Sequence, residues 1–131
     1  MTRSEFEAAV LDFYGVRADY PFEDDLVTGV FRHTGSGKWF AIAMNIEKMR
    51  LGITSGGRCD VVNLKCLPDV IESLVGIERG IYPAYHMNKT HWLTLSLEEC
   101  DEETVLWLLS ASYDLTLGKK KQERIRKKRS L

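Results

Sequence analysis

Residues 91–115 read HWLTLSLEECDEETVLWLLSASYDL, and this stretch contains a strand pattern followed by a helix pattern. Within the expected strand 91–97, Trp92, Thr94 and Ser96 alternate with three leucines, which predicts a β-strand with one apolar face. Asp101 stands where a helix N-cap is expected, and the two glutamates after it are favourable in a first helical turn. Apolar residues then recur at helical spacing through Tyr113, which predicts a last helix.

The residues before this stretch also alternate between helix and strand patterns. The first helix has two candidate capping boxes, Thr2 with Glu5 and Ser4 with Glu7, and Gly15 can end it. In chain order the expected elements are a helix at 2–14 with Phe6, Val10, Phe13 and Tyr14 on one face, a strand at 26–33, a turn at 34–37, a strand at 38–44, a long connection at 45–57, a strand at 58–66, a helix at 68–75, strands at 79–82 and 91–97, and the last helix.

The order α-β-β-β-α-β-β-α predicts an α+β fold. Consecutive hairpins indicate a single, largely antiparallel sheet of about five strands packed with helices. We expect helices to cover one face, while the other face stays open to solvent or to a partner. The length of 131 residues fits one domain, which we place at 1–118, followed by a tail at 119–131.

Charge is distributed unevenly along the chain. Residues 1–118 carry 10 Lys and Arg against 18 Asp and Glu, a net charge of −8, whereas residues 119–131 carry 8 basic residues against Glu123, a net charge of +7. An acidic domain with a basic tail is a pattern that often marks an interaction segment. No stretch approaches the roughly 18 apolar residues that a membrane-spanning helix needs.

The cysteines indicate a reducing compartment. Cys59, Cys66 and Cys100 are odd in number and form no CxxC pair, so we expect reduced thiols and neither a disulfide framework nor a zinc site. The first residues turn acidic at once and lack the apolar segment of a signal peptide. We therefore expect a cytoplasmic protein with no membrane partner and no metal or organic cofactor. Because no heptad seam is present, we expect a monomer or a weak dimer, the monomer first.

Several short motifs occur in the order found in one protein family. The most specific is YPAYHMNKTHW at 82–92; the others are DYPF at 19–22, FRH at 31–33, KWFA at 38–41, NLKC at 63–66 and SYDL at 112–115. Together they resemble the MmcQ/YjbR family over most of the chain. The resemblance implies a frataxin-like or secretion-chaperone-like fold, and members of the family are described as DNA-binding proteins with a double-wing arrangement. Residues 98–101 lack the Gly and Pro that members often carry before the last helix, and the tail lies outside the family pattern.

The segment 85–92 is the main candidate binding site within the domain. Its side chains can contact phosphates or stack on bases: Tyr85, His86, Asn88, Lys89, His91 and Trp92. The alternative is a structured turn, with Asn88 and Lys89 at its tip, the histidines bonded to the backbone and the aromatic rings packed beneath.

Metal binding and catalysis have weaker sequence support. Cys66 or Asp60 could join His86 and His91 around a metal, but the histidine spacing is not that of a zinc site. Cys66 beside a histidine could act as a nucleophile, but no nucleophile elbow, phosphate loop or HExxH motif accompanies it. We therefore expect no enzymatic activity.

Two functions remain open. The first is weak, non-specific DNA binding, dominated by tail cations that can follow phosphates: Lys119, Lys120, Lys121, Arg124, Arg126, Lys127, Lys128 and Arg129. In the domain, this function needs a positive stripe built from Arg32, Lys38, Lys65 and Lys89. The second is a protein-interaction or chaperone-like adaptor that uses the open sheet face or an exposed edge. A continuous basic stripe would favour nucleic acid, whereas an apolar groove on an acidic body would favour a protein partner.

Overall fold

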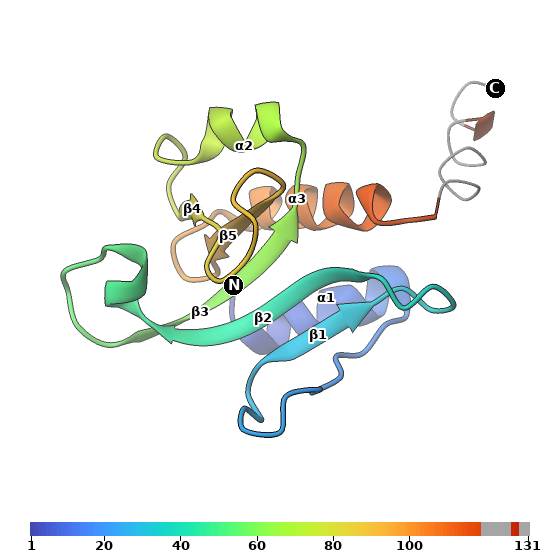
Figure 1. The fold of residues 1–131 in the computed structure, drawn as a ribbon, viewed down its shortest axis with the longest axis horizontal. Helices are drawn as coiled ribbons and strands as arrows, with labels where there is room; N and C mark the ends of the chain where they lie inside the picture. Colours follow the sequence, from blue (N-terminus) through green and yellow to red (C-terminus); the bar gives the residue numbers. More distant parts are fainter. Residues whose placement is uncertain (119–126, 129–131) are drawn as a thin grey trace.

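The computed structural model describes residues 1–118 and 127–128 and shows one sheet with its helices (Figure 1). The elements are α1 (Arg3–Tyr14), β1 (Gly29–Arg32), β2 (Trp39–Glu47), the 3-10 helix η1 (Lys48–Leu51), β3 (Arg58–Lys65), α2 (Pro68–Leu74), β4 (Ile81–Pro83), β5 (Trp92–Ser96) and α3 (Glu102–Leu115). The strands lie in the order β1-β2-β3-β5-β4, and every neighbouring pair is antiparallel. The predicted α+β class and single antiparallel sheet are confirmed.

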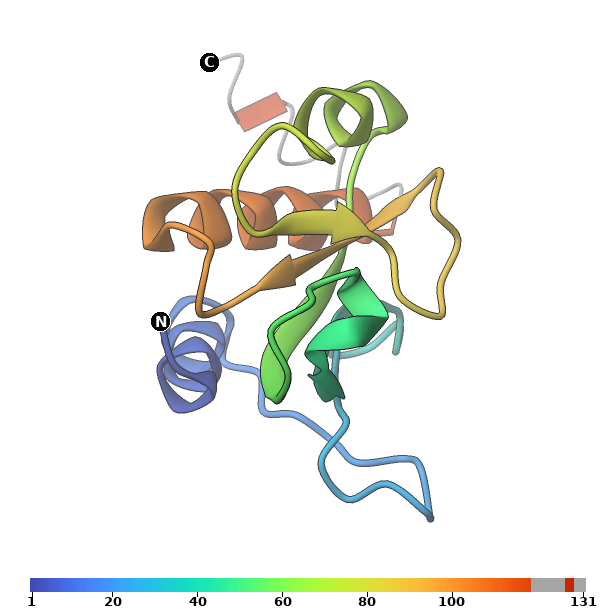
Figure 2. The same cartoon turned by 90° about the vertical axis from the view of Figure 1, so that its left-hand side faces the viewer.

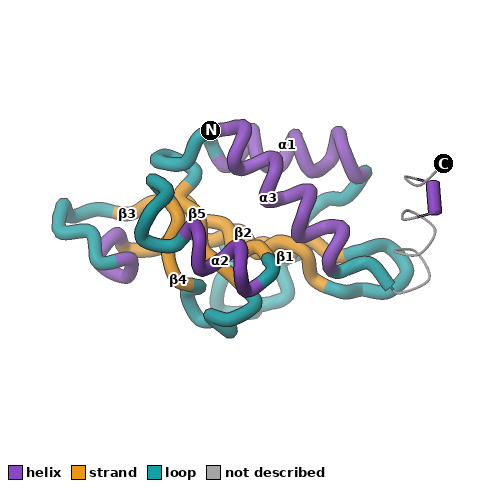
Figure 3. Tube along the Cα trace, turned by 90° about the horizontal axis from the view of Figure 1, so that it is seen from above, coloured by secondary structure: helices purple, strands orange, loops and turns teal. Residues whose placement is uncertain are grey.

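The main core lies between the sheet and two helices. Figure 3 shows α1 and α3 on the same face of the sheet, while α2 lies beyond the β4 edge in Figure 1. The predicted alternation of β5 is confirmed, because Leu93, Leu95 and Leu97 are all buried in this core. Phe6 and Val10 of α1 pack into the same core and are fully buried.

The first helix begins and ends as one of its predicted patterns indicates. Thr2 is the N-cap and forms a capping box with Glu5, so the alternative box starting at Ser4 is not used. Gly15 ends the helix with φ of 66°, in the left-handed region that glycine adopts readily. The prediction for Phe13 is wrong, because its side chain is 62% exposed.

The last helix begins at the predicted position but without the predicted cap. Asp101 occupies the N-cap position, yet its side chain makes no capping hydrogen bond. Ser96 closes the preceding turn instead, since its hydroxyl accepts the Glu99 N–H at 3.3 Å and its carbonyl accepts the Cys100 N–H at 2.9 Å. A serine turn thus replaces the Gly and Pro that are lacking there.

The first strand is shorter than predicted. It begins at Gly29 and not at 26, because Asp25 folds the preceding residues into a turn. One Asp25 oxygen accepts the N–H groups of Val27 and Thr28 at 3.0 and 2.9 Å. Val27, which we expected in a strand, is 54% exposed.

The second strand is longer than predicted. β2 continues past 44 to Glu47, because Asn45 pairs with Asp60 and Glu47 with Arg58 of β3. The expected long connection therefore starts later, and η1 occupies its first residues.

The second face of the sheet differs from our expectation of an open surface. Residues 19–28 and 84–91 form two loops that project on the side away from α1 and α3 (Figure 2). They partly cover this face, so the sheet has helices on one side and loops on the other.

The cysteines are buried and unpaired at all three positions. Among the helices of the described residues, none has the length and apolar character needed to cross a bilayer.

Candidate functional site

The loop-covered face has an apolar cluster of its own. Alternation along β2 places Ile42, Met44 and Ile46 on this face, beside Val30 of β1 and Val61 of β3. All five side chains are buried. They form a continuous apolar floor separate from the main core.

A β-bulge sets the end of this floor. Phe31 pairs with Ala41 but Arg32 pairs with Trp39, so Phe40 is the extra residue of the bulge. Phe40 packs into the main core, while Trp39 packs against the second cluster. The Arg32 guanidinium carbon lies 5.5 Å from the centre of the Trp39 ring, within cation–π range.

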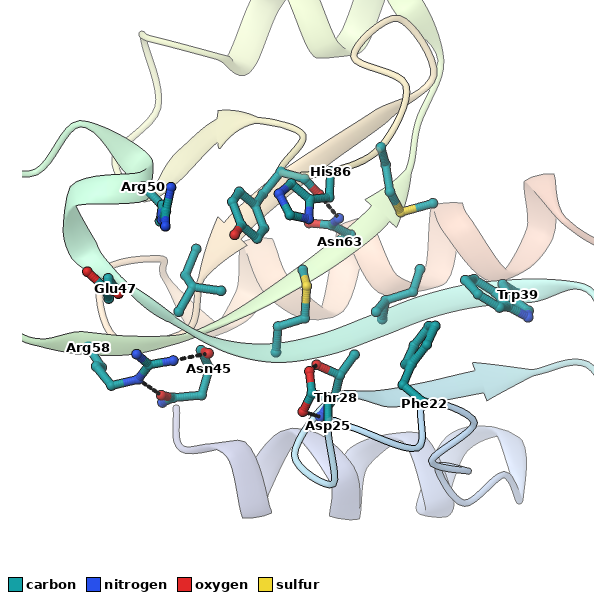
Figure 4. A pocket seen from close by; sticks show the side chains of 15 residues that line it. Phe22, Asp25, Thr28, Trp39, Asn45, Glu47, Arg50, Arg58, Asn63 and His86 are labelled. Atoms are coloured by element: carbon teal, nitrogen blue, oxygen red, sulfur yellow. Dashed lines mark hydrogen bonds between the residues drawn. The ribbon is translucent and has the colours of Figure 1, made fainter.

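A groove with a volume of about 660 Å³ lies over the floor. In Figure 4 β2 runs beneath it, with the first loop on one side and the second loop on the other. The lining residues from the two loops are Phe22, Asp25, Thr28, Tyr85, His86 and Met87. Volume and apolar lining are typical of sites that bind ligands.

The first loop is held by Asp25. Besides its two backbone partners, the Asp25 carboxylate accepts a hydrogen bond from the Thr28 hydroxyl. These bonds, those from Thr28 foremost, lower the pKa of Asp25. The Phe22 ring meets the Trp39 ring edge to face at 6.3 Å, so the loop also packs against the floor.

The second loop is anchored to the sheet by a closed hydrogen-bond network. Asn63 of β3 donates to the Tyr85 carbonyl at 2.8 Å, and the Tyr85 N–H donates to the Thr94 hydroxyl at 2.8 Å. The Thr94 hydroxyl in turn donates to the Asn63 side-chain oxygen. Asn63 and Thr94 are 1% and 0% exposed, so this network fixes both backbone groups of Tyr85 in a dry setting.

The tip of the second loop is a structured turn. The Asn88 side-chain oxygen accepts the N–H groups of Thr90 and His91 at 2.9 and 3.0 Å, and its carbonyl accepts the Trp92 N–H at 3.0 Å. Asn88 thus has the turn role that was one of the two alternatives for this segment.

His86 stands out by its backbone. Its φ of 57° lies in the left-handed region, which non-glycine residues seldom adopt. The ring of His86 stacks on Tyr85 with the centres 3.9 Å apart. Both rings line the groove. Because backbone positions of this kind cluster at functional sites, His86 is a candidate residue of this site.

One end of the groove is cationic. Arg58 donates to the side chain and to the carbonyl of Asn45 at 2.6 and 2.8 Å, and the Asn45 amide donates to Asp60 at 3.0 Å. Arg50 of η1 lies at the same end, together with Glu47 (Figure 4). Because Asn45 is neutral, its bonds orient Arg58 without cancelling its charge.

A second, smaller hollow adjoins this end. It has a volume of about 270 Å³ and shares Arg50, Tyr85 and His86 with the groove. Lys89 also lines it. The two hollows therefore meet at one arginine and at the stacked rings of Tyr85 and His86.

The predicted site residues are only partly brought together. Tyr85 and His86 line the groove, Trp92 packs against the floor, and His91 is exposed. The groove lining includes none of the cations that we expected to form a stripe, Arg32, Lys38, Lys65 and Lys89. Arg32 is instead ion-paired with Asp19 at 2.6 Å.

The basic tail cannot be placed in the same way. Lys127 and Lys128 are exposed. The other predicted tail residues lie outside the described residues: Lys119, Lys120, Lys121, Arg124, Arg126 and Arg129.

The environment of Cys66 disfavours a role as nucleophile or metal ligand. Cys66 is buried, and burial raises the pKa of its thiol. Its backbone N–H donates to the His91 carbonyl at 2.9 Å. A nucleophile or metal ligand needs the thiolate, which this setting disfavours.

Sequence reasoning placed only Tyr85 and His86 of the groove lining in a site, and the residues that it missed include Phe22, Asn45, Arg50 and Arg58. Three of them lie at or beyond the predicted end of the second strand, in or just after the part we took for a connection. The signal was the spacing of Ile42, Met44 and Ile46, which extends the strand alternation past 44.

Comparison with known proteins places this chain in a family. The YjbR family model matches residues 11–115. The chain is 37% identical over 117 residues to "Uncharacterized protein YyaQ" of Bacillus subtilis (strain 168), covering 88% of this chain and 98% of that protein.

Solved structures show the same architecture. A crystal structure of a Pseudomonas syringae protein has a TM-score of 0.86 at 37% identity, covering 89% of this chain and 100% of that chain. A solution NMR structure from the same organism has a TM-score of 0.81 at 37% identity, covering 91% and 95%. A Deinococcus radiodurans protein, with a TM-score of 0.66 at 23% identity and coverage of 94% and 86%, shares the fold. The chain therefore belongs to the YjbR family, as its motifs predicted.

Proposed function

We propose that this chain is a non-enzymatic adaptor, acting as a monomer in the cytoplasm, that holds an extended segment of a protein partner in the groove. The observation that carries the proposal is the apolar floor of Ile42, Met44 and Ile46 between two anchored loops. An apolar groove on an acidic body is the arrangement that favours a protein partner over nucleic acid.

Exposed apolar side chains beside the groove support a partner larger than a small molecule. Leu26 and Val27 of the first loop are 80% and 54% exposed, and Met49 of η1 is 69% exposed. These residues belong to the segments that border the groove, outside its lining. Exposed apolar side chains near a groove are typical of protein-interaction sites.

The edges of the sheet are poorly suited to pairing with a strand of the partner, which favours binding on the face of the sheet. Asp19 and Val30 exchange two backbone hydrogen bonds of 2.9 and 2.8 Å, which occupy part of the β1 edge. β4 at the other edge has three residues and ends at Pro83. Short, covered or proline-containing edges resist pairing with another chain.

The cysteines support the proposed compartment and the absence of catalysis. Three buried, unpaired thiols fit a reducing environment. The raised pKa of the Cys66 thiol argues against its use as a nucleophile.

DNA binding is the second candidate, and the eight cations of the tail favour it. DNA binding through the two loops would bring the first loop to the phosphates, but that loop contains Glu23, Asp24 and Asp25 and no Lys or Arg. Those carboxylates would repel phosphates. We therefore expect DNA binding to be weak, non-specific and carried by the tail.

A pull-down from native lysate, with and without nuclease, tests the two candidates together. The groove variant is Phe22→Ser, and its matched control is Phe13→Ser on α1, since these side chains are 40% and 62% exposed. The adaptor proposal expects a nuclease-resistant partner that Phe22→Ser loses and Phe13→Ser retains. A partner that nuclease removes, and that deletion of residues 119–131 abolishes, would instead favour DNA.

A fluorescence-anisotropy titration against random duplex DNA at two salt concentrations tests the second candidate alone. Deleting residues 119–131 should remove most of the affinity and its salt dependence, whereas changing Lys89 and His91 to alanine should have a smaller effect. Equal binding by the truncated protein would show that the tail is inert.

A further inference from the structure

We propose that the groove selects a partner segment in which a carboxylate lies beside large apolar side chains, with the carboxylate bound at the Arg50 and Arg58 end. This inference rests on the adaptor function proposed above and specifies the chemistry of the partner. It is argued from the shape of the groove, the setting of Arg58 and the balance of charge around it.

The groove is extended and its two ends differ. Its lining follows β2 from Trp39 to Glu47. At about 3.3 Å per residue, eight steps along a strand span about 26 Å. In Figure 4 Phe22 and Trp39 lie at one end, and Arg50 and Arg58 lie at the other. An extended chain with an apolar part and an anionic part matches this polarity.

Arg58 is held ready for a carboxylate. It makes two hydrogen bonds to Asn45, at 2.6 and 2.8 Å, and a guanidinium has five N–H donors in all. Asp60 bonds to Asn45 at 3.0 Å and fixes the amide that orients the arginine. The guanidinium therefore keeps donors and its charge while its side chain is oriented, which lowers the entropy cost of binding an anion.

The local charge at this end is opposite to that of the domain. Arg50, Arg58 and Lys89 line the two adjoining hollows, against the carboxylate of Glu47 in the lining and that of Asp60 behind Asn45, so three cations face two carboxylates. The other acid of the groove, Asp25, has its oxygens engaged by the Val27 and Thr28 groups of its own turn.

This contrast supports selectivity for acidic segments. Residues 1–118 carry a net charge of −8, so the domain as a whole attracts basic segments. A basic end in the groove opposes that attraction for any chain that enters it, because like charges placed together are strongly unfavourable. The electrostatic potential of the basic end thus favours acidic segments, whereas that of the domain as a whole favours basic segments.

The test is a fluorescence-anisotropy titration of the full chain with four labelled, end-capped peptides. Three share a run of leucine and phenylalanine preceded by glutamates, glutamines or lysines, and the fourth has glutamates before a run of serines. The acidic–apolar peptide should bind at least about tenfold more tightly than each of the others. Among the apolar peptides, only the acidic one should lose affinity when salt is added.

Substitutions at the basic end connect this preference to the groove. Arg58→Gln should weaken the acidic–apolar peptide about tenfold and leave the glutamine peptide unchanged. Arg58→Lys should lie between, because a lysine keeps the charge but not the fork of donors. Arg17→Gln, an exposed arginine outside the groove lining, is the matched control and should change nothing.

Three outcomes would overturn the inference. If the glutamine peptide binds as tightly as the acidic one and Arg58→Gln has no effect, the groove is a protein site without charge selection, and the adaptor proposal stands. If the lysine peptide binds best, the field of the domain governs selection. If no apolar peptide binds, the adaptor proposal fails together with the inference built on it.

Discussion

Replacement of Asn63 by leucine should destabilise the protein by detaching the second loop from the sheet. The Asn63 side chain donates to the Tyr85 carbonyl at 2.8 Å and accepts from the Thr94 hydroxyl. Leucine is similar in size but has neither group. The substitution therefore leaves the Tyr85 carbonyl and the Thr94 hydroxyl without these partners in a site where Asn63 is 1% exposed.

The expected loss follows from the cost of buried polar groups without partners. Each such group costs about 1–3 kcal/mol, so two of them cost about 2–6 kcal/mol. The added apolar surface of leucine returns about 1 kcal/mol. The free energy of unfolding should fall by about 1–5 kcal/mol, which for a urea dependence near 2 kcal/mol/M lowers the unfolding midpoint by about 0.5–2.5 M.

Urea unfolding followed by tryptophan fluorescence measures this shift. Thr94→Val should cost a comparable amount, because Thr94 bonds to both Asn63 and the Tyr85 N–H. The double variant should lose less than the sum of the two, since either change already opens the network. Thr54→Val, at an exposed position, is the control. An Asn63→Leu midpoint equal to that of the control, or strict additivity in the double variant, would refute the network.

Other perturbations have equally definite outcomes. Gly80 has φ of 84°, and a Cβ there would lie 2.7 Å from the Cys100 backbone nitrogen, so Gly80→Ala should lower the urea midpoint. The pKa of Asp25 is lowered in the fold, so the ionised carboxylate stabilises the folded protein above the ordinary pKa of 3.8, and this stabilisation is lost as the pH falls through the folded pKa. The difference in unfolding free energy between wild type and Asp25→Ala should therefore be smaller at about pH 3 than at about pH 6. Burial raises the pKa of the Cys66 thiol, so iodoacetamide at mildly alkaline pH should modify it far more slowly in native than in urea-unfolded protein.

The elements that sequence reasoning placed correctly depend on neighbours along the chain. The Thr2 capping box joins residues three positions apart, and the alternation in β5 needs only the next residue. The turn at 34–37 likewise closes through a local bond, from the His33 N–H to the Lys38 carbonyl at 2.9 Å. Such signals are present in a single sequence because the interacting groups are close in it.

The features that sequence reasoning missed depend on pairing between distant residues. The bulge at Phe40 exists only in the register between β1 and β2, and the role of Asn63 appears only once Tyr85 and Thr94 are beside it. Arg58 becomes a site residue because β2 brings Asn45 to it. No local pattern encodes these contacts, since each depends on how separate strands align.

The covering of the second face was also beyond local reasoning. An alternating strand predicts which side chains share a face but not what lies over them. Phe22 belongs to a loop whose course is set by the Asp25 turn, and its contact with Trp39 joins that loop to a strand across a second turn. The groove results from where the two loops lie, and the sequence suggested only that a face was left without helices.

Methyl NMR of the protein labelled at its four methionines tests most directly whether the groove is a binding site. Met44 and Met87 line the groove, Met49 lies exposed on η1 beside it, and Met1 packs against the core on the helix side, where it serves as an internal control. During a titration with the acidic–apolar peptide, the methyl signals of Met44 and Met87 should shift together and saturate, while the Met1 signal stays in place. Binding that leaves Met44 and Met87 unchanged, or that shifts Met1 instead, would contradict the account.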